Sequence, residues 1–111
     1  MAQAPVDKSR VFGTVIVLEA CEGLTRASDG VHGTYSETDR RIVYDPARDK
    51  AVRAIVHEHI HAYRRAAGLT VGSDDNEEER AVVLAESMVC DFVLNNPELA
   101  KWLLKGLLAE L

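Results

Sequence analysis

The spacing of apolar residues changes near residue 45 of this 111-residue chain. Before that point the apolar positions form short β-branched runs, which are typical of strands. After it they recur every three or four residues, which is typical of helices. The longest early run lies within residues 10–18 (RVFGTVIVL) and predicts one strand. Residues 1–9 mix proline with charged and small side chains, and we expect them to form a flexible tail.

Two shorter runs predict a β-hairpin. Residues 32–35 and 40–44 carry the apolar and aromatic side chains, and the polar segment 36–39 between them (SETD) has turn-forming composition. We therefore expect the second and third strands to pair antiparallel. Together with residues 10–18 they predict a small three-stranded, mainly antiparallel sheet.

Helical spacing follows Asp45-Pro46, where the aspartate can accept hydrogen bonds from first-turn amides and proline suits the first helical position. The predicted helix extends to about Ala67, and Gly68 supplies a left-handed stop. Its core-facing side is expected to be an apolar stripe made of Val52, Val56, Ile60, Tyr63 and Ala67.

Two further helices are predicted over residues 76–95, capped by Asp74 or Asp75, and from Pro97 to the end. The first of them has an apolar stripe made of Ala81, Val82, Ala85, Val89 and Phe92, and Glu78 falls in the same stripe. The last helix has an apolar face made of Leu99, Trp102, Leu103, Leu107 and Leu108, a candidate for contact with a second copy of the chain. Strands followed by helices predict a single α+β domain over residues 1–111.

Composition narrows the classes of partner. The formal net charge is −5 and the sequence pI is near 5.3, which argues against a nucleic-acid partner. No apolar run is long enough to span a membrane, and a secretory leader is not evident, so we expect no membrane partner and a cytoplasmic location. The two cysteines, Cys21 and Cys90, are expected to be free thiols in a reducing compartment.

The segment from His57 to His61 reads HExxH and is the strongest chemical signal in the chain. On a helix, residues four apart lie on one face, so His57 and His61 can reach a single metal ion. Glu58 is rotated by about 100° from His57, which places its carboxylate beside the metal as a general base. His59 lies about 200° from His57 and is expected to take no part.

A catalytic zinc site usually has three protein ligands and a water. We expect Glu78 to supply the third ligand, because it is an acid directed inward on the next helix and the two helices should pack antiparallel. Glu77 and Glu79 remain alternatives within the same acidic run, and only helical phase favours Glu78. Glu86 is expected to be a boundary charge. Bound Zn²⁺ with Glu58 as base predicts hydrolysis of peptide bonds.

The sequence HEHIH with a downstream glutamate resembles the gluzincin zinc peptidases, and most of all the minigluzincins and the ImmA/IrrE-type peptidases of phage and mobile elements. The resemblance covers about residues 33–99. It implies a minimal zincin-like metallopeptidase domain and a peptide or protein substrate. It also implies that the strand before the motif helix, here residues 40–44 with Ile42, Val43 and Tyr44, holds an extended substrate by main-chain hydrogen bonds.

Two questions stay open at this level. Tyr35, Tyr44 and His32 are candidates to donate a hydrogen bond to a developing oxyanion. The alternative function is that of a catalytically idle zinc-binding relative that serves as a regulatory or protein-interaction module.

Overall fold

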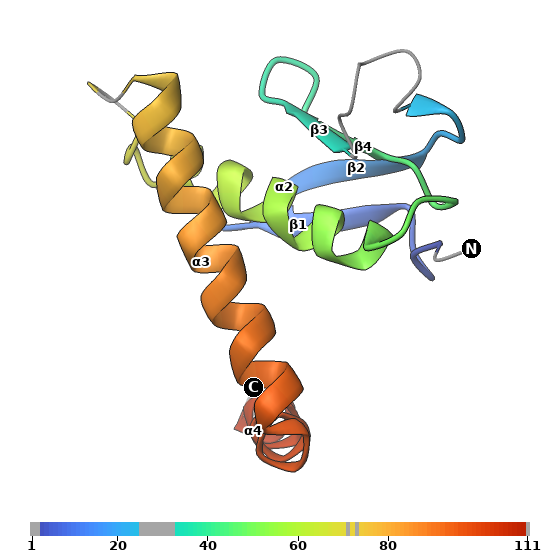
Figure 1. Cartoon of the computed structure of the whole chain (residues 1–111), viewed down its shortest axis with the longest axis vertical. Coiled ribbons are helices and arrows are strands. Elements are labelled where there is room, and N and C mark those ends of the chain that lie inside the picture. The colour runs from blue at the N-terminus through green and yellow to red at the C-terminus, as the bar shows by residue number, and fades with distance from the viewer. Residues whose placement is uncertain (1–2, 25–32, 71, 73, 111) are drawn as a thin grey trace.

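The computed structural model describes residues 3–24, 33–70, 72 and 74–110 of the chain (Figure 1). A small sheet comes first and three helices follow. The elements are β1 (Lys8–Val11), β2 (Thr14–Ala20), β3 (Gly33–Ser36), β4 (Arg41–Tyr44), α2 (Ala51–Ala66), α3 (Asp75–Asn95) and α4 (Pro97–Glu110). The predicted α+β layout of strands followed by helices is confirmed.

The sheet has four strands in the order β1-β2-β4-β3, and it is mixed. β1 pairs with β2 and β3 pairs with β4 antiparallel, whereas β2 and β4 are parallel. The prediction of a three-stranded, mainly antiparallel sheet is therefore wrong in strand number and in the central pairing. The arrangement makes β4 an inner strand and leaves β1 and β3 at the edges.

The first predicted strand is two strands joined by a tight turn. Phe12 and Gly13 both have positive φ, 48° and 82°, and form a two-residue loop that lets Val11 face Thr14. The prediction of a tail through residue 9 is also wrong at its end, because β1 begins at Lys8. The amide of Ala4 donates to the Tyr44 hydroxyl at 2.9 Å and attaches the preceding segment to the sheet.

The helix that carries HExxH begins at Ala51, five positions after the predicted start at Pro46. Asp45 is buried and accepts hydrogen bonds from the amides of Gly23 and Ala47, so it holds a turn rather than a helix terminus. The residue before the helix, Lys50, has a left-handed φ of 63°. The predicted stop is confirmed, because Gly68 has a φ of 74° just beyond the helix.

The main core lies between the sheet and α2, which crosses one face of it (Figure 1). Its members are Val11, Ile16, Leu18, Ile42, Tyr44 and, from α2, Ala62. The apolar stripe predicted for this helix is not the buried one, since Val52 is 63% and Tyr63 42% exposed. The buried side of α2 carries Ala51, Glu58 and Ala62. Small alanines let the helix approach the sheet closely, and Glu58 is buried with them.

The helix α3 packs on α2 through its first half and then extends past it, with α4 at the far end (Figure 1). Its start is as predicted, because the Asp74 side chain accepts a hydrogen bond from the Glu77 amide at 2.8 Å. Cys21 and Cys90 are free, as predicted. Across the described part of the chain, no helix combines the length and apolar character needed to cross a bilayer.

The inner position of β4 predicts the effect of a conservative substitution. Ile42 is fully buried, so Ile42→Val should lower the free energy of unfolding by about 0.5–1.5 kcal/mol. Val52→Ala, at a 63% exposed position on α2, should change it by no more than about 0.5 kcal/mol. Urea denaturation followed by circular dichroism measures both. Equal losses in the two variants would contradict the placement of Ile42 in the core.

Candidate metal centre

The helix α2 directs the HExxH side chains toward β3 and α3. His57 and His61 lie one turn apart on the same face, with ring centroids 5.0 Å from each other. Glu58 is only 8% exposed and lies beside them at the cleft that both rings line. The predicted arrangement of the motif on one helix is confirmed.

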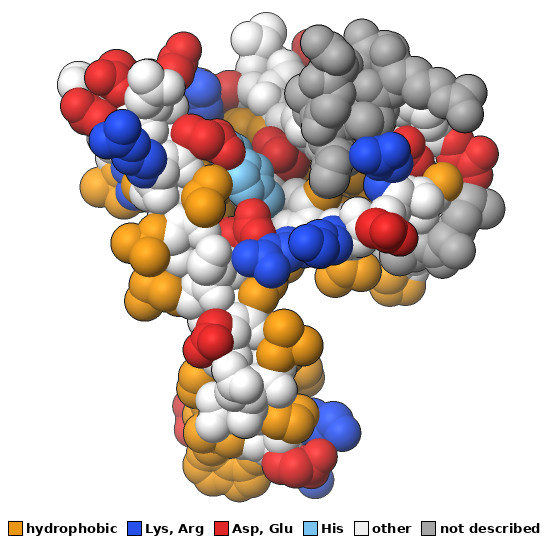
Figure 2. All heavy atoms as spheres, viewed as in Figure 1, with side chains coloured by type: hydrophobic (Ala, Val, Ile, Leu, Met, Phe, Trp, Pro, Cys, Tyr) orange, Lys and Arg blue, Asp and Glu red, His pale blue; other side chains and the backbone are white. Residues whose placement is uncertain are grey.

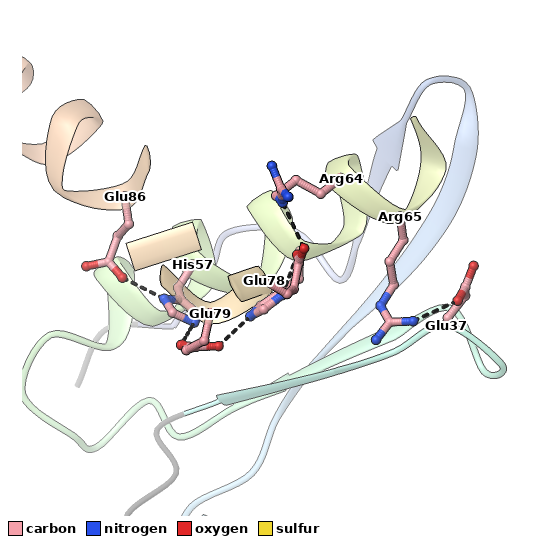
Figure 3. Close-up of polar contacts among 8 residues, drawn as sticks. Glu37, His57, Arg64, Arg65, Glu78, Glu79 and Glu86 are labelled. Atoms are coloured by element: carbon pink, nitrogen blue, oxygen red, sulfur yellow. Dashed lines mark hydrogen bonds and ion pairs between the residues drawn. The ribbon is translucent and has the colours of Figure 1, made fainter. Parts of the chain in front are cut away.

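One carboxylate of α3 meets the outer nitrogens of both rings. Glu79 Oε1 lies 2.9 Å from His57 Nε2, and Glu79 Oε2 lies 3.2 Å from His61 Nε2 (Figure 3). One potential ligand atom from each of these three residues lies within 4.8 Å of the others. The group that could hold a metal ion is therefore His57, His61 and Glu79, and the predicted third ligand Glu78 is not part of it.

The inner nitrogens of the rings face two other carboxylates. His57 Nδ1 lies 2.7 Å from Glu86 Oε1, and His61 Nδ1 lies 3.3 Å from Glu78 Oε1. Glu78 is buried, as its position in the apolar stripe predicts, but it lies behind His61 rather than beside its Nε2 atom. Carboxylates that bind Nδ1–H orient metal-ligating histidines and make them more basic.

Each of these two carboxylates also binds an arginine of α2. Arg64 Nε donates to Glu78 Oε2 at 2.9 Å (Figure 3). Arg53 donates to Glu86 and, at 3.4 Å, to the Ser87 hydroxyl. The arginines lie toward the two ends of α2, so the pairs join α2 to α3 on both sides of the histidines.

The contacts of the two rings are compatible with a cation among the outer nitrogens. A neutral imidazole has one N–H and one lone pair, yet all four ring nitrogens of His57 and His61 face carboxylate oxygens. Without a cation, each neutral ring would direct a lone pair at an anion, whereas a doubly protonated ring would donate from both of its nitrogens. With a metal ion at the Nε2 atoms, the Nδ1–H groups donate to Glu86 and Glu78, and no conflict remains. Zinc ligands at bond lengths of about 2.0–2.1 Å are about 3.3 Å apart, close to the separations found here.

Burial and charge shift the acidity of the carboxyl groups. Burial raises the pKa of Glu58, and the opposing influence of His57 and His61 does not cancel this. A raised pKa is typical of a carboxylate that serves as a general base. Burial also acts to raise the pKa of Glu86, but hydrogen bonds and charges from Arg53 and His57 outweigh it and lower the pKa.

The three-residue group opens onto a cleft of about 790 Å³ between α2, α3 and β3. Figure 2 shows histidine surface in a hollow bordered by acidic side chains. Gly33 forms part of the β3 wall, and a Cβ at that position would lie 3.4 Å from Glu58 Cγ and 3.2 Å from the Val43 oxygen. Glycine therefore lets the strand approach Glu58 closely.

The structure corrects the predicted substrate-binding strand. Ile42 and Tyr44 belong to the core, and β4, which also contains Val43, pairs with β2 on one side and β3 on the other. Its main-chain groups are therefore already bonded within the sheet. The strand that lines the cleft and lies at an edge of the sheet formed by the described residues is β3.

The remaining candidates from the sequence, for the oxyanion and for the metal, lie in different places. Tyr35 lines the cleft, whereas the Tyr44 hydroxyl accepts a hydrogen bond from Ala4. His32 lies outside the described residues. His59 bonds on the other side of α2, with Nδ1 on the Ile55 carbonyl and Nε2 on the Ser9 hydroxyl, both at 2.8 Å, so its exclusion from the site is confirmed.

The sequence predicts a boundary charge at Glu86 and favours Glu78 over Glu79 as the third ligand, whereas Glu86 lies at His57 Nδ1 and Glu79 at both Nε2 atoms. A usable signal exists, because Glu79 and Glu86 are seven positions apart and thus two turns apart on the same face of α3. His57 and His61, one turn apart on α2, face this side of α3.

No protein family, curated protein or solved structure matches this chain. The resemblance to gluzincins thus rests on the motif residues themselves.

Burial of Glu58 predicts that its charge destabilises the metal-free protein. In chelator-treated protein at neutral pH, Glu58→Gln should raise the free energy of unfolding by about 1 kcal/mol, because the amide is less costly to bury than the carboxylate. Glu22→Gln, at an exposed position, should change it by less than about 0.5 kcal/mol. Thermal and urea denaturation measure both. A less stable Glu58→Gln variant would refute the burial argument.

Proposed function

We propose that this chain is a zinc-dependent endopeptidase of the gluzincin type that acts on a peptide or protein substrate in the cytoplasm. The observation that supports this most is the distribution of carboxylates around two histidines. Glu79 meets both Nε2 atoms, while Glu86 and Glu78 lie at the two Nδ1 atoms. Ligands backed by hydrogen-bonding carboxylates are typical of metal centres in hydrolytic enzymes.

In this proposal His57, His61 and Glu79 hold the ion, and Glu79 replaces Glu78 as the third ligand. Zinc bound there would polarise a substrate carbonyl and acidify a water molecule. Glu58 would accept the proton from that water, since it is the buried carboxylate beside the two histidines with the raised pKa. Tyr35 lines the cleft and packs against the core, and its phenol would donate to the oxyanion.

The edge position of β3 in the described sheet suggests how the substrate binds. An extended peptide can add to an exposed strand edge by main-chain hydrogen bonds, and β3 forms the wall of the cleft opposite His57 and His61. Such a peptide would pass between β3 and α2 over Glu58. This role replaces the one that the sequence suggested for Ile42, Val43 and Tyr44.

An idle zinc-binding module is the alternative. Structural zinc sites are usually closed by four protein ligands, whereas three ligand residues converge here at an open cleft. Burying the Glu58 carboxylate beside the ligands costs free energy, and a purely structural zinc site does not need it. Its presence therefore also supports hydrolysis.

Zinc affinity distinguishes the three neighbouring glutamates. Glu79→Gln should weaken zinc binding by more than about 100-fold, since a ligand is lost, while Glu78→Gln should weaken it by about 10–100-fold, as expected when only the orientation of His61 is affected. Glu77→Gln, on the same turn, is the matched control and should leave the affinity unchanged. Competition with a chromophoric chelator measures all three. A larger loss for Glu78→Gln than for Glu79→Gln would restore Glu78 as the ligand.

Cleavage of a peptide library tests the reaction. Wild-type protein loaded with zinc should cut, Glu58→Gln should bind zinc with similar affinity but cut at least about 100-fold more slowly, and chelation should abolish cleavage reversibly. His59→Gln, a substitution away from the cleft, should retain activity. Zinc-loaded wild-type protein that cuts no peptide would favour the idle module, and full activity in Glu58→Gln would contradict its assignment as the base.

A further inference from the structure

Arg65 continues the row of cleft-facing side chains on α2. It follows His61 by four positions, as His61 follows His57, so the three residues lie on one face of the helix and each is one turn from the next. All three line the cleft. An arginine therefore lies one turn, about 6 Å along the helix axis, beyond the nearer of the two histidines.

The strand β3 runs along α2 toward Arg65. A Cβ at Gly33, the first residue of β3, would lie 3.4 Å from Glu58 Cγ, and Glu37, which follows the last residue of β3, pairs with Arg65. Figure 3 shows Arg65 extending from α2 across to Glu37. An extended peptide that adds to the edge of β3 over Glu58 would thus pass Arg65. At about 3.3 Å per residue, it would reach Arg65 about two to three residues from the bond at the metal.

The pair between Arg65 and Glu37 is weak enough to exchange. Arg65 Nη1 donates to Glu37 Oε2 at 3.1 Å, and the two side chains are 43% and 59% exposed. Exposed pairs of this kind contribute little to stability, because water competes for both charges. A carboxylate of a bound substrate can therefore replace Glu37 as the partner of the guanidinium, and two parallel hydrogen bonds would make that contact specific.

The other charges at this end of the cleft also favour an anion. Burial and the charge of Glu37 raise the pKa of Tyr35, while the positive charges of Arg65 and Arg40 act to lower it, so two arginines and one glutamate act on this phenol. Glu79 lines the cleft from α3, and in the proposed function the zinc ion offsets its charge. The net charge of −5 on the chain is screened beyond about 8 Å at physiological ionic strength, so the local charges dominate.

We propose that Arg65 determines substrate specificity by binding a carboxylate of the substrate a short distance from the cleaved bond. This proposal rests on the peptidase function proposed above, and it adds the class of substrate, an acidic peptide. The carboxylate belongs to an aspartate or glutamate side chain or to the C-terminus of the substrate. Both present the same planar pair of oxygens, which matches the fork of the guanidinium.

Paired peptides test the preference. Each pair in a quenched fluorogenic library differs only by Glu or Gln at one position, and all these peptides are amidated at the C-terminus. Zinc-loaded wild-type protein should cut the Glu peptide with about fivefold higher kcat/KM at one position, about two to three residues from the cleaved bond. Arg65→Gln should reduce this ratio to about one.

A second set of peptides distinguishes the two sources of the carboxylate. These peptides contain no acidic side chain and end in a free C-terminus at each of the tested positions. A preference for Glu in the amidated pairs assigns the carboxylate to a side chain. A preference for the free C-terminus over its amide, lost in Arg65→Gln, assigns it to the end of the substrate. Either result supports the proposal.

Two further variants sharpen the test. Glu37→Gln leaves Arg65 without its competing partner, so it should lower KM for the acidic peptide by about two- to threefold with little change in kcat. Arg10→Gln, on β1 at the other edge of the sheet from β3, is the matched control and should keep the wild-type ratio. Zinc affinity and circular dichroism of Arg65→Gln should match those of wild type, since Arg65 pairs with Glu37 and not with a residue of the metal group.

The outcomes separate this proposal from the function on which it rests. Cleavage with equal kcat/KM for all peptides, or a preference that persists in Arg65→Gln, would overturn the proposal and leave the peptidase function intact. If no peptide is cut, the peptidase function fails, and binding decides about Arg65. Zinc-loaded Glu58→Gln should then bind the preferred acidic peptides about fivefold more tightly than their neutral counterparts in fluorescence anisotropy. Equal binding would overturn the proposal as well.

Discussion

Carboxylates that are removed from water need cationic or hydrogen-bonding partners, and the packing of α2 against α3 depends on this need. Glu58 and Glu78 are each 8% exposed, and Glu86 is almost as enclosed between α2 and α3. Arg64 and Arg53 offset the charges of Glu78 and Glu86, and their pairs fix how α3 lies along α2. Within the part of the chain that the structure describes, Glu58 has no such partner, so its environment is the one that a nearby cation would change most.

Local chemistry could be predicted from the sequence, but the rotation of one helix against another could not. The HExxH spacing correctly placed His57, Glu58 and His61, and helical phase correctly predicted that Glu78 is buried. Phase does not tell which buried acid reaches which nitrogen. Arg64 binds Glu78 on the inner side of His61, and the exposed neighbour Glu79 reaches the Nε2 atoms. Helical phase disfavoured Glu79 because it placed this residue on the exposed side of α3. An open metal site would lie at such an exposed position beside the cleft.

The fold shows the same division between local and distant determinants. The β3–β4 hairpin, the stop near Gly68 and the Asp74 cap follow from turn and capping residues close in sequence. The parallel pairing of β2 with β4 joins residues such as Val17 and Arg41 across an intervening strand, and no local pattern predicts it. Asp45 has the composition of a helix cap, but the Gly23 amide, distant in sequence, binds its carboxylate instead.

The locality of the candidate metal centre also bears on the order of folding. Its residues, from Arg53 to Glu86, all belong to two consecutive helices joined by a short connection, whereas the sheet needs the distant β2–β4 pairing. Contacts between near neighbours in sequence form faster than distant ones, since less loop-closure entropy opposes them. The α2–α3 pair can therefore collect its histidines and carboxylates before the sheet is complete.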